Sequence, residues 1–84
     1  MITCVVDYDP FAMDSRITLI KDEDSSECYQ GCSNLPELAE TLQSFSHQYG
    51  FNKVMIHAPE HIFEELNRIT NTNFTDNKLE LEII

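Results

Sequence analysis

Two pairs of side chains have the types and spacings of metal ligands. Three residues separate Cys28 from Cys32, and three separate His57 from His61. Thiolate and imidazole are ligands of structural zinc sites, and both spacings fall within the range that such sites use. The two pairs lie far apart in the chain, so they would have to meet through the fold. The alternative is two free thiols in a loop and two exposed histidines where a helix begins. We expect this alternative, with no cofactor bound.

The sequence gives less support to covalent catalysis by a cysteine and to phosphate binding by a glycine-rich loop. A catalytic cysteine needs a neighbouring base or a positive field to form its thiolate, and Cys28 instead follows the acidic residues 22–27. The two glycines of the chain are isolated, so there is no glycine-rich loop for phosphate. We therefore expect a protein that is not an enzyme.

Charge is the strongest compositional feature. Fifteen Asp and Glu residues face five Lys and Arg residues, which gives the 84-residue chain a net charge of −10. Such a surface repels nucleic-acid phosphates and anionic membranes and attracts basic proteins. The chain has no apolar run of membrane-spanning length, and its N-terminal segment lacks the basic start of a secretory signal. We expect a cytoplasmic protein whose three cysteines are free thiols.

Acidic side chains are the first candidates for partner binding. Residues 22–27 carry four acids, and the last predicted strand carries two more on one face. If these carboxylates converge, they form a negative surface like an array of phosphates, to which Lys and Arg side chains of a partner would bind. The partner-binding residues that we select are Asp22, Glu23, Asp24, Glu27, Glu80, Glu82, Phe11 and Met13.

Phe11 and Met13 supply the apolar part of this candidate site. They lie in a loop that follows the strand-breaking pair Asp9-Pro10. Loops of this kind usually pack their apolar side chains on the core. If these two side chains are exposed instead, they form a binding tip ringed by Asp9 and Asp14.

Hydrophobic patterns predict the strands. Residues 2–8 and 16–21 are rich in β-branched and apolar residues. In the first of these strands Ile2, Cys4, Val6 and Tyr8 share one face, so Cys4 is expected in the core. The short apolar run 54–56 predicts a strand covered on both faces, and residues 78–84 predict a last strand with alternating faces. Residues 22–27 are predicted as an acidic turn, and residues 28–32 form either a third strand or a loop.

Two helices are predicted between these strands. Asn34 is a good N-cap with Glu37 completing a capping box, and Gly50 supplies the stop. The second helix begins at Pro59, and residues 71–77 are predicted as a polar loop after it. The order is strand, strand, a third strand if residues 28–32 form one, helix, strand, helix, strand. We expect a single α+β domain, residues 1–84, with a mixed sheet of four or five strands and two helices packed against it.

This order of elements resembles the core of the ribonuclease-H-like superfamily over nearly the whole chain. The segment VVDYDP at residues 5–10 is similar to the first strand of that superfamily, where an acid follows aliphatic residues. The resemblance implies that Asp7 matches the first catalytic carboxylate and that Glu37 or Glu40 matches the second. The fourth strand ends without the acid that the superfamily keeps there, and a nuclease needs a basic path for its substrate. We therefore expect the fold without catalysis. A ferredoxin-like sandwich is the competing fold if residues 28–32 form a loop.

In size, charge and lack of catalytic residues, the chain also resembles small acidic inhibitor proteins of phages and other mobile elements, of the anti-restriction and anti-CRISPR type. The resemblance implies a non-enzymatic interaction protein, an inhibitor or nucleic-acid mimic that blocks a basic nucleic-acid-binding partner. It implies no direct binding of nucleic acid or membrane. The alternatives are a small zinc-binding or degenerate ribonuclease-H-like domain, and a homodimer joined through a sheet edge or a helix face.

Overall fold

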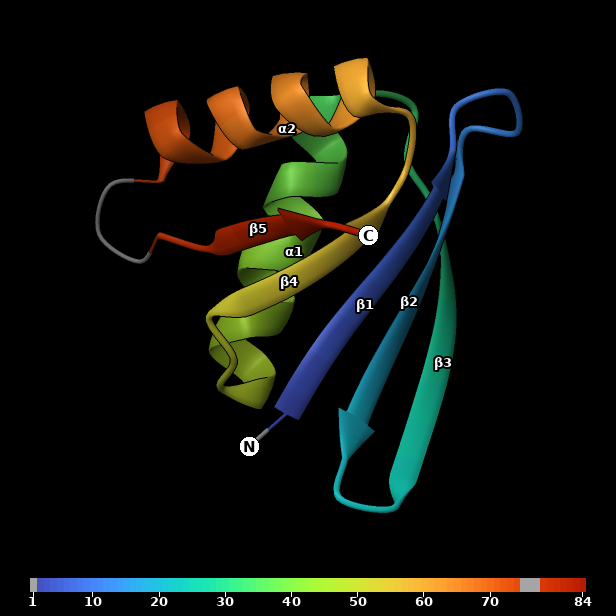
Figure 1. Ribbon diagram of the computed structural model, residues 1–84, viewed down its shortest axis with the longest axis vertical. Coiled ribbons are helices and arrows are strands. Elements are labelled where there is room, and N and C mark those ends of the chain that lie inside the picture. The colour runs from blue at the N-terminus through green and yellow to red at the C-terminus, as the bar shows by residue number, and fades with distance from the viewer. Residues whose placement is uncertain (1, 75–77) are drawn as a thin grey trace.

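Five strands and two helices form a single sheet with one helical layer in the computed structural model, which describes residues 2–74 and 78–84 (Figure 1). The elements in chain order are β1 Ile2–Asp9, β2 Asp14–Lys21, β3 Asp24–Gly31, α1 Leu35–Tyr49, β4 Lys53–His57, α2 Glu60–Asn73 and β5 Glu80–Ile83. The predicted α+β fold and its element order are confirmed. Because β3 is a full strand, the ferredoxin-like alternative is wrong. Neither helix in the described residues is long and apolar enough to cross a lipid bilayer.

The path of the chain through the sheet places both helices on the same face. The strand order is β3-β2-β1-β4-β5. The pairs β1–β2 and β2–β3 are antiparallel, and the pairs β1–β4 and β4–β5 are parallel. The crossover from β3 to β4 through α1 and that from β4 to β5 through α2 advance in the same direction. Right-handed crossovers that advance in one direction lie on one side of a sheet. Figure 1 shows α1 behind β4 and β5 and α2 across one end of the sheet, and both helices contribute side chains to one core cluster, so no described helix covers the opposite face.

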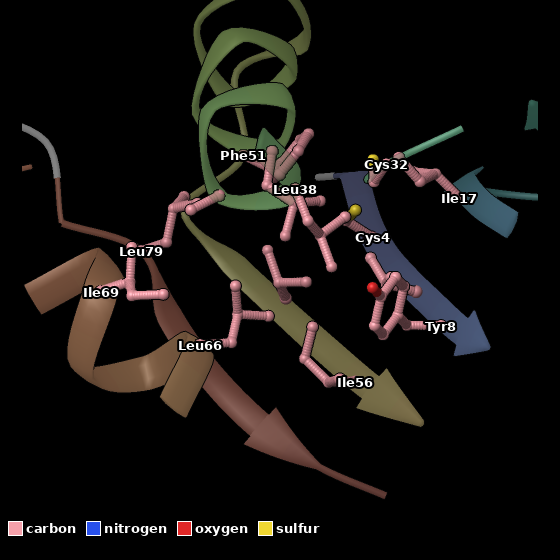
Figure 2. Packing of buried hydrophobic residues seen from close by; sticks show 14 residues of the cluster. Cys4, Tyr8, Ile17, Cys32, Leu38, Phe51, Ile56, Leu66, Ile69 and Leu79 are labelled. Atoms are coloured by element: carbon pink, nitrogen blue, oxygen red, sulfur yellow. The ribbon is translucent and has the colours of Figure 1, made fainter. Parts of the chain in front are cut away.

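The core lies between this helical layer and one face of the sheet (Figure 2). Cys4, Val6 and Tyr8 of β1 are buried on that face, as the strand periodicity predicted. Val54 and Ile56 of β4 are also fully buried there. The prediction that residues 54–56 are covered on both faces is wrong, because Met55 points to the face without helices and is only partly buried.

The ends of α1 agree with the sequence signals. The Asn34 side chain accepts a hydrogen bond from the Glu37 backbone N–H at 2.9 Å. The Glu37 carboxylate in turn accepts one from the Ser33 N–H at 3.0 Å. At the other end Gly50 has a left-handed backbone with φ of 78°, and its N–H donates to the Ser46 carbonyl at 2.8 Å. These contacts satisfy helix-end groups that would otherwise lack partners.

Two predicted loops are shorter than expected. The acidic segment turns only at Asp22 and Glu23, and β3 begins at Asp24, which pairs with Lys21. A left-handed backbone at Asp22, with φ of 57°, makes the two-residue turn. The helix α2 continues through Asn73 rather than ending before residue 71, and in its last turn Asn71 and Thr72 donate side-chain hydrogen bonds to carbonyls of the preceding turn. The rest of the predicted loop, residues 75–77, lies outside the described residues.

We expect Gly50→Ala to lower the free energy of unfolding by about 1 kcal/mol, because an alanine side chain disfavours the left-handed backbone that ends α1. Gly31→Ala is the matched control. Gly31 has no positive φ, and an added Cβ would meet nothing within 4 Å. Urea unfolding of both variants measures the difference. Equal losses of stability would show that Gly50 is not needed for this helix end.

Candidate functional site

The loop between β1 and β2 is held in shape by its own hydrogen bonds. The Asp9 Oδ1 atom accepts from the Phe11 N–H at 2.9 Å and from the Ala12 N–H at 3.3 Å. Met13 has a left-handed backbone with φ of 52°, and its carbonyl accepts from the Cys32 N–H at 3.0 Å. Asp9 thus forms the side-chain turn that Asp residues favour. The loop is therefore a defined projection at one end of the β1–β2 hairpin.

Two large apolar side chains on this loop lie in solvent. Phe11 is 98% exposed and Met13 is 56% exposed. The usual arrangement, in which such side chains pack on the core, does not occur here. The second arrangement is observed, with Phe11 and Met13 at an exposed tip that Asp9 and Asp14 flank. We call residues 9–14 the Phe11 tip.

The Phe11 tip adjoins a polar cluster on the face of the sheet without helices, which we call the open face. In the strand register Asp7 lies opposite Arg16 on one side and opposite His57 on the other. The Asp7 carboxylate accepts a hydrogen bond from Arg16 Nη2 at 3.1 Å, and its other oxygen lies 3.4 Å from His57 Nδ1. All three side chains are partly exposed, so each pair contributes little to stability. Each carboxylate oxygen of Asp7 therefore has a neighbouring nitrogen.

A shallow cleft of about 240 Å³ connects this cluster to the tip. Its lining residues are Asp7, Asp9, Ala12, Asp14, Arg16 and Tyr29. Tyr29 is 66% exposed and lies opposite Arg16 on the neighbouring strand. Sequence reasoning missed Arg16 and Tyr29 as parts of a site. The hairpin register could have indicated Arg16, because a tight turn after Asp9 brings residue 16 opposite residue 7.

The structure separates the acids that were predicted as one array. Asp22 and Glu23 form the turn at the end of β2 that is opposite to the Phe11 tip. Glu27 lies on β3, at one edge of the sheet, whereas Glu80 and Glu82 lie on β5, at the other edge. Glu27, Glu80 and Glu82 share the face of the sheet without helices, but they lie at its opposite edges, so these carboxylates do not form one compact array.

The four candidate metal ligands also lie apart. Cys32 is buried on the helical side, and Cys28 pairs with buried Ile17 on that same side. His57 alternates with buried Ile56 and so points to the open face, while His61 is exposed in the first turn of α2. No group of three or more His, Cys, Asp and Glu side chains within residues 2–74 and 78–84 could hold a metal ion.

The nuclease-like carboxylates implied by the family resemblance are separated in the same way. Asp7 points to the open face, because its neighbours Val6 and Tyr8 are buried on the helical face. Glu37 and Glu40 belong to α1, which lies on the helical side. The structure thus gives Asp7 no second carboxylate from α1.

Burial keeps two of the cysteines as neutral thiols. Desolvation raises the pKa of Cys4 to about 12, and the nearby Cys28 adds to the shift. Burial also raises the pKa of Cys32, although a hydrogen bond with Ser15 acts in the opposite direction. A thiol with a raised pKa forms little thiolate at neutral pH and is a poor nucleophile.

Comparisons with known proteins support the fold alone. No protein-family model matches the chain, and no curated protein sequence matches it. Part of an uncharacterized Pseudomonas aeruginosa protein with similarity to peptidase YEAZ has a similar structure, with a TM-score of 0.54 at 8% identity. Part of the PPX-GPPA enzyme of Aquifex aeolicus is similar with a TM-score of 0.54 at 13% identity. The alignments cover 99% and 100% of this chain but only 42% and 36% of those chains.

We expect only Cys28 to react quickly with a thiol reagent in the folded protein at pH 8. Cys28 is partly exposed, whereas Cys4 and Cys32 are buried and should react more than about tenfold more slowly. Time-resolved labelling with an aromatic disulfide measures the rates. The Cys28→Ser variant should lose the fast phase, and denatured protein should react at all three thiols. Fast labelling of Cys4 or Cys32 in the native protein would contradict the packing described above.

Proposed function

We propose that the protein is a non-enzymatic interaction module that blocks a basic, nucleic-acid-binding protein, and that Phe11 is its anchor. The observation that carries the proposal is the 98% exposure of Phe11 on a loop that Asp9 holds in shape. An exposed aromatic side chain gains free energy when a partner covers it, about 1.5–3 kcal/mol for complete burial. Aromatic residues of this kind dominate the binding energy of many interfaces.

Order in the loop favours tight binding. The hydrogen bonds from Phe11 and Ala12 to Asp9, and from Cys32 to Met13, restrict the tip before any partner arrives. A segment that is already ordered loses less conformational entropy when it binds. The tip therefore meets two requirements of an anchor, a large apolar side chain and a defined backbone.

Charge indicates what kind of partner would bind. The chain carries a net charge of −10, and its described arginines, Arg16 and Arg68, already pair with Asp7 and Glu65. Most carboxylates are thus left without a basic partner, among them the exposed Asp9 of the Phe11 tip. A partner with a basic surface would gain attraction and a faster association rate. The same basic surface would bind nucleic-acid phosphates, so this protein would compete with nucleic acid.

The geometry around Asp7 supports a function without catalysis. Arg16 and His57 flank its carboxylate, and α1, which carries Glu37 and Glu40, lies on the other side of the sheet. The raised pKa of the buried thiols of Cys4 and Cys32 gives no support to nucleophilic chemistry there.

We expect Phe11→Ala to weaken partner binding at least about tenfold, because the variant removes the anchor without touching the core. The tagged protein would first capture partners from host lysate, and the affinity for the purified partner would then be measured by calorimetry. Ile84→Ala is the matched control, since Ile84 is also exposed, at 59%, but lies outside the tip. Both variants should keep the unfolding temperature of the parent protein.

Two variants at Asp9 separate the order of the loop from its charge. Asp9→Asn keeps an oxygen that can accept the two loop hydrogen bonds but removes a charge, whereas Asp9→Ala removes both. We expect the alanine variant to bind more weakly than the asparagine variant. A captured partner that is not basic, that is indifferent to competing DNA, or that binds Phe11→Ala with unchanged affinity would contradict the proposal.

A further inference from the structure

The strand β3 is an open edge of the sheet. It lies at one end of the sheet order and, among the described strands, pairs only with β2. Seven of its eight residues are exposed, and only Cys28 is partly buried. Figure 1 shows β2 and β3 extending away from both helices. No described element therefore pairs with the outer side of β3, and its helical face is covered only in part, at Cys28.

The strand register identifies the backbone groups that point outward. Hydrogen-bonded pairs alternate along an antiparallel ladder. The Cys32 N–H donates to the Met13 carbonyl, so the pair 13–32 is hydrogen-bonded. Counting along the register, the pairs through Gln30, Cys28, Ser26 and Asp24 are hydrogen-bonded to β2 as well. The N–H and C=O groups of the remaining residues point to the free edge, and these residues are Ser25, Glu27, Tyr29 and Gly31.

We propose that β3 receives an extended, basic segment of the partner as a sixth strand. The free backbone groups would supply the pairing, as in other recognition modes that add a strand to a sheet edge. The charged side chains of β3 are both acidic, Asp24 and Glu27, and Asp22 and Glu23 precede them in the turn. Lys21, opposite Asp24, offsets one of these charges. The proposal rests on the proposed function for the basic character of the partner, and it adds the mode of recognition and the surface.

Side chains on the two faces of β3 suit basic residues. On the open face Glu27 and Tyr29 are two positions apart, so one Lys or Arg of an added strand could contact both the carboxylate and the ring. On the helical face a mostly apolar hollow of about 220 Å³ adjoins Asp24 and Ser26, with Leu19 and Tyr49 among its lining residues. The aliphatic stem of a long basic side chain can cover apolar surface while its charged end stays in water.

A second copy of the chain is a poorer occupant of this edge. Pairing two β3 strands would bring together two chains of net charge −10. It would also place the acidic turns and the Asp24 and Glu27 side chains of both copies along one narrow ladder. Acidic edge strands of this kind are a known protection against self-pairing.

The test uses the full chain and a peptide of alternating lysine and valine with blocked ends. Hydrogen exchange followed by NMR should show new protection at the Ser25, Glu27 and Tyr29 amides when the peptide is present. Ser26 and Cys28 should be protected with or without it. Glu27→Pro removes one outward N–H, and Glu27→Ala removes the same charge but keeps that N–H. We expect the proline variant to bind the peptide at least about tenfold more weakly than the alanine variant.

A second measurement leaves the protein unchanged and so does not depend on the folding of a variant. N-methylation of alternate residues in the peptide keeps its charge but blocks strand pairing, and it should abolish the protection. Equal binding of the methylated and unmethylated peptides would overturn the proposal, as would equal affinities of the two Glu27 variants. A dimer in light scattering with β3 amides already protected would overturn it in favour of a second copy. Phe11→Ala should leave peptide binding to β3 unchanged. A failure of the Phe11 anchor proposal can therefore be distinguished from a failure of the proposed strand pairing at β3.

Discussion

The two crossovers of the chain advance in the same direction across the sheet, and the rest of the structure depends on this constraint. Both helices must then lie on one face, and the core of fully buried side chains forms there. In β1 the residues Cys4, Val6 and Tyr8 enter the core, while Val5 and Asp7 between them face the uncovered side. A sheet with one covered face leaves its other face, its edge strand β3 and its hairpin loops available for contact. The candidate surfaces of this protein are all found among these uncovered parts.

Local signals were sufficient to predict most of the fold. The capping residues Asn34 and Gly50 mark the two ends of α1. Asn34 supplies an acceptor for a free N–H group at the start of the helix, and Gly50 adopts the left-handed backbone that ends it. The alternation in β1 predicted which side chains enter the core. β3 could not be predicted in full, because a strand exposed on both faces has no hydrophobic alternation to reveal it. The partial burial of Met55 is also not predictable, since a short apolar run does not tell whether one or two layers of helices cover a strand.

The candidate site is only partly predictable from the sequence, because the exposure and the relative positions of its side chains depend on the fold. Phe11 and Met13 were identified from their types and their acidic neighbours, but their exposure depends on whether the loop turns toward the core. That outcome follows from the hydrogen bonds of Asp9 and the left-handed backbone of Met13. Clustering in the sequence indicates the acids at residues 22–27 and in β5 as candidates, but it carries no information on where they lie in space. They lie on different parts of the molecule, because a hairpin and two crossovers lie between them.

Taken together, the exposed Phe11 tip, the open edge of β3 and the surplus of carboxylates fit a protein that binds a basic partner along the β1–β2–β3 side of its sheet. The most direct test is a hydrogen-exchange footprint of the protein in complex with a partner captured from lysate. Reduced exchange at residues 9–14 and at the outward amides of β3, with the exposed faces of α1 and α2 unchanged, is the predicted result. Protection confined to the helices, with the tip and β3 exchanging as in the free protein, would contradict the proposed mode of binding.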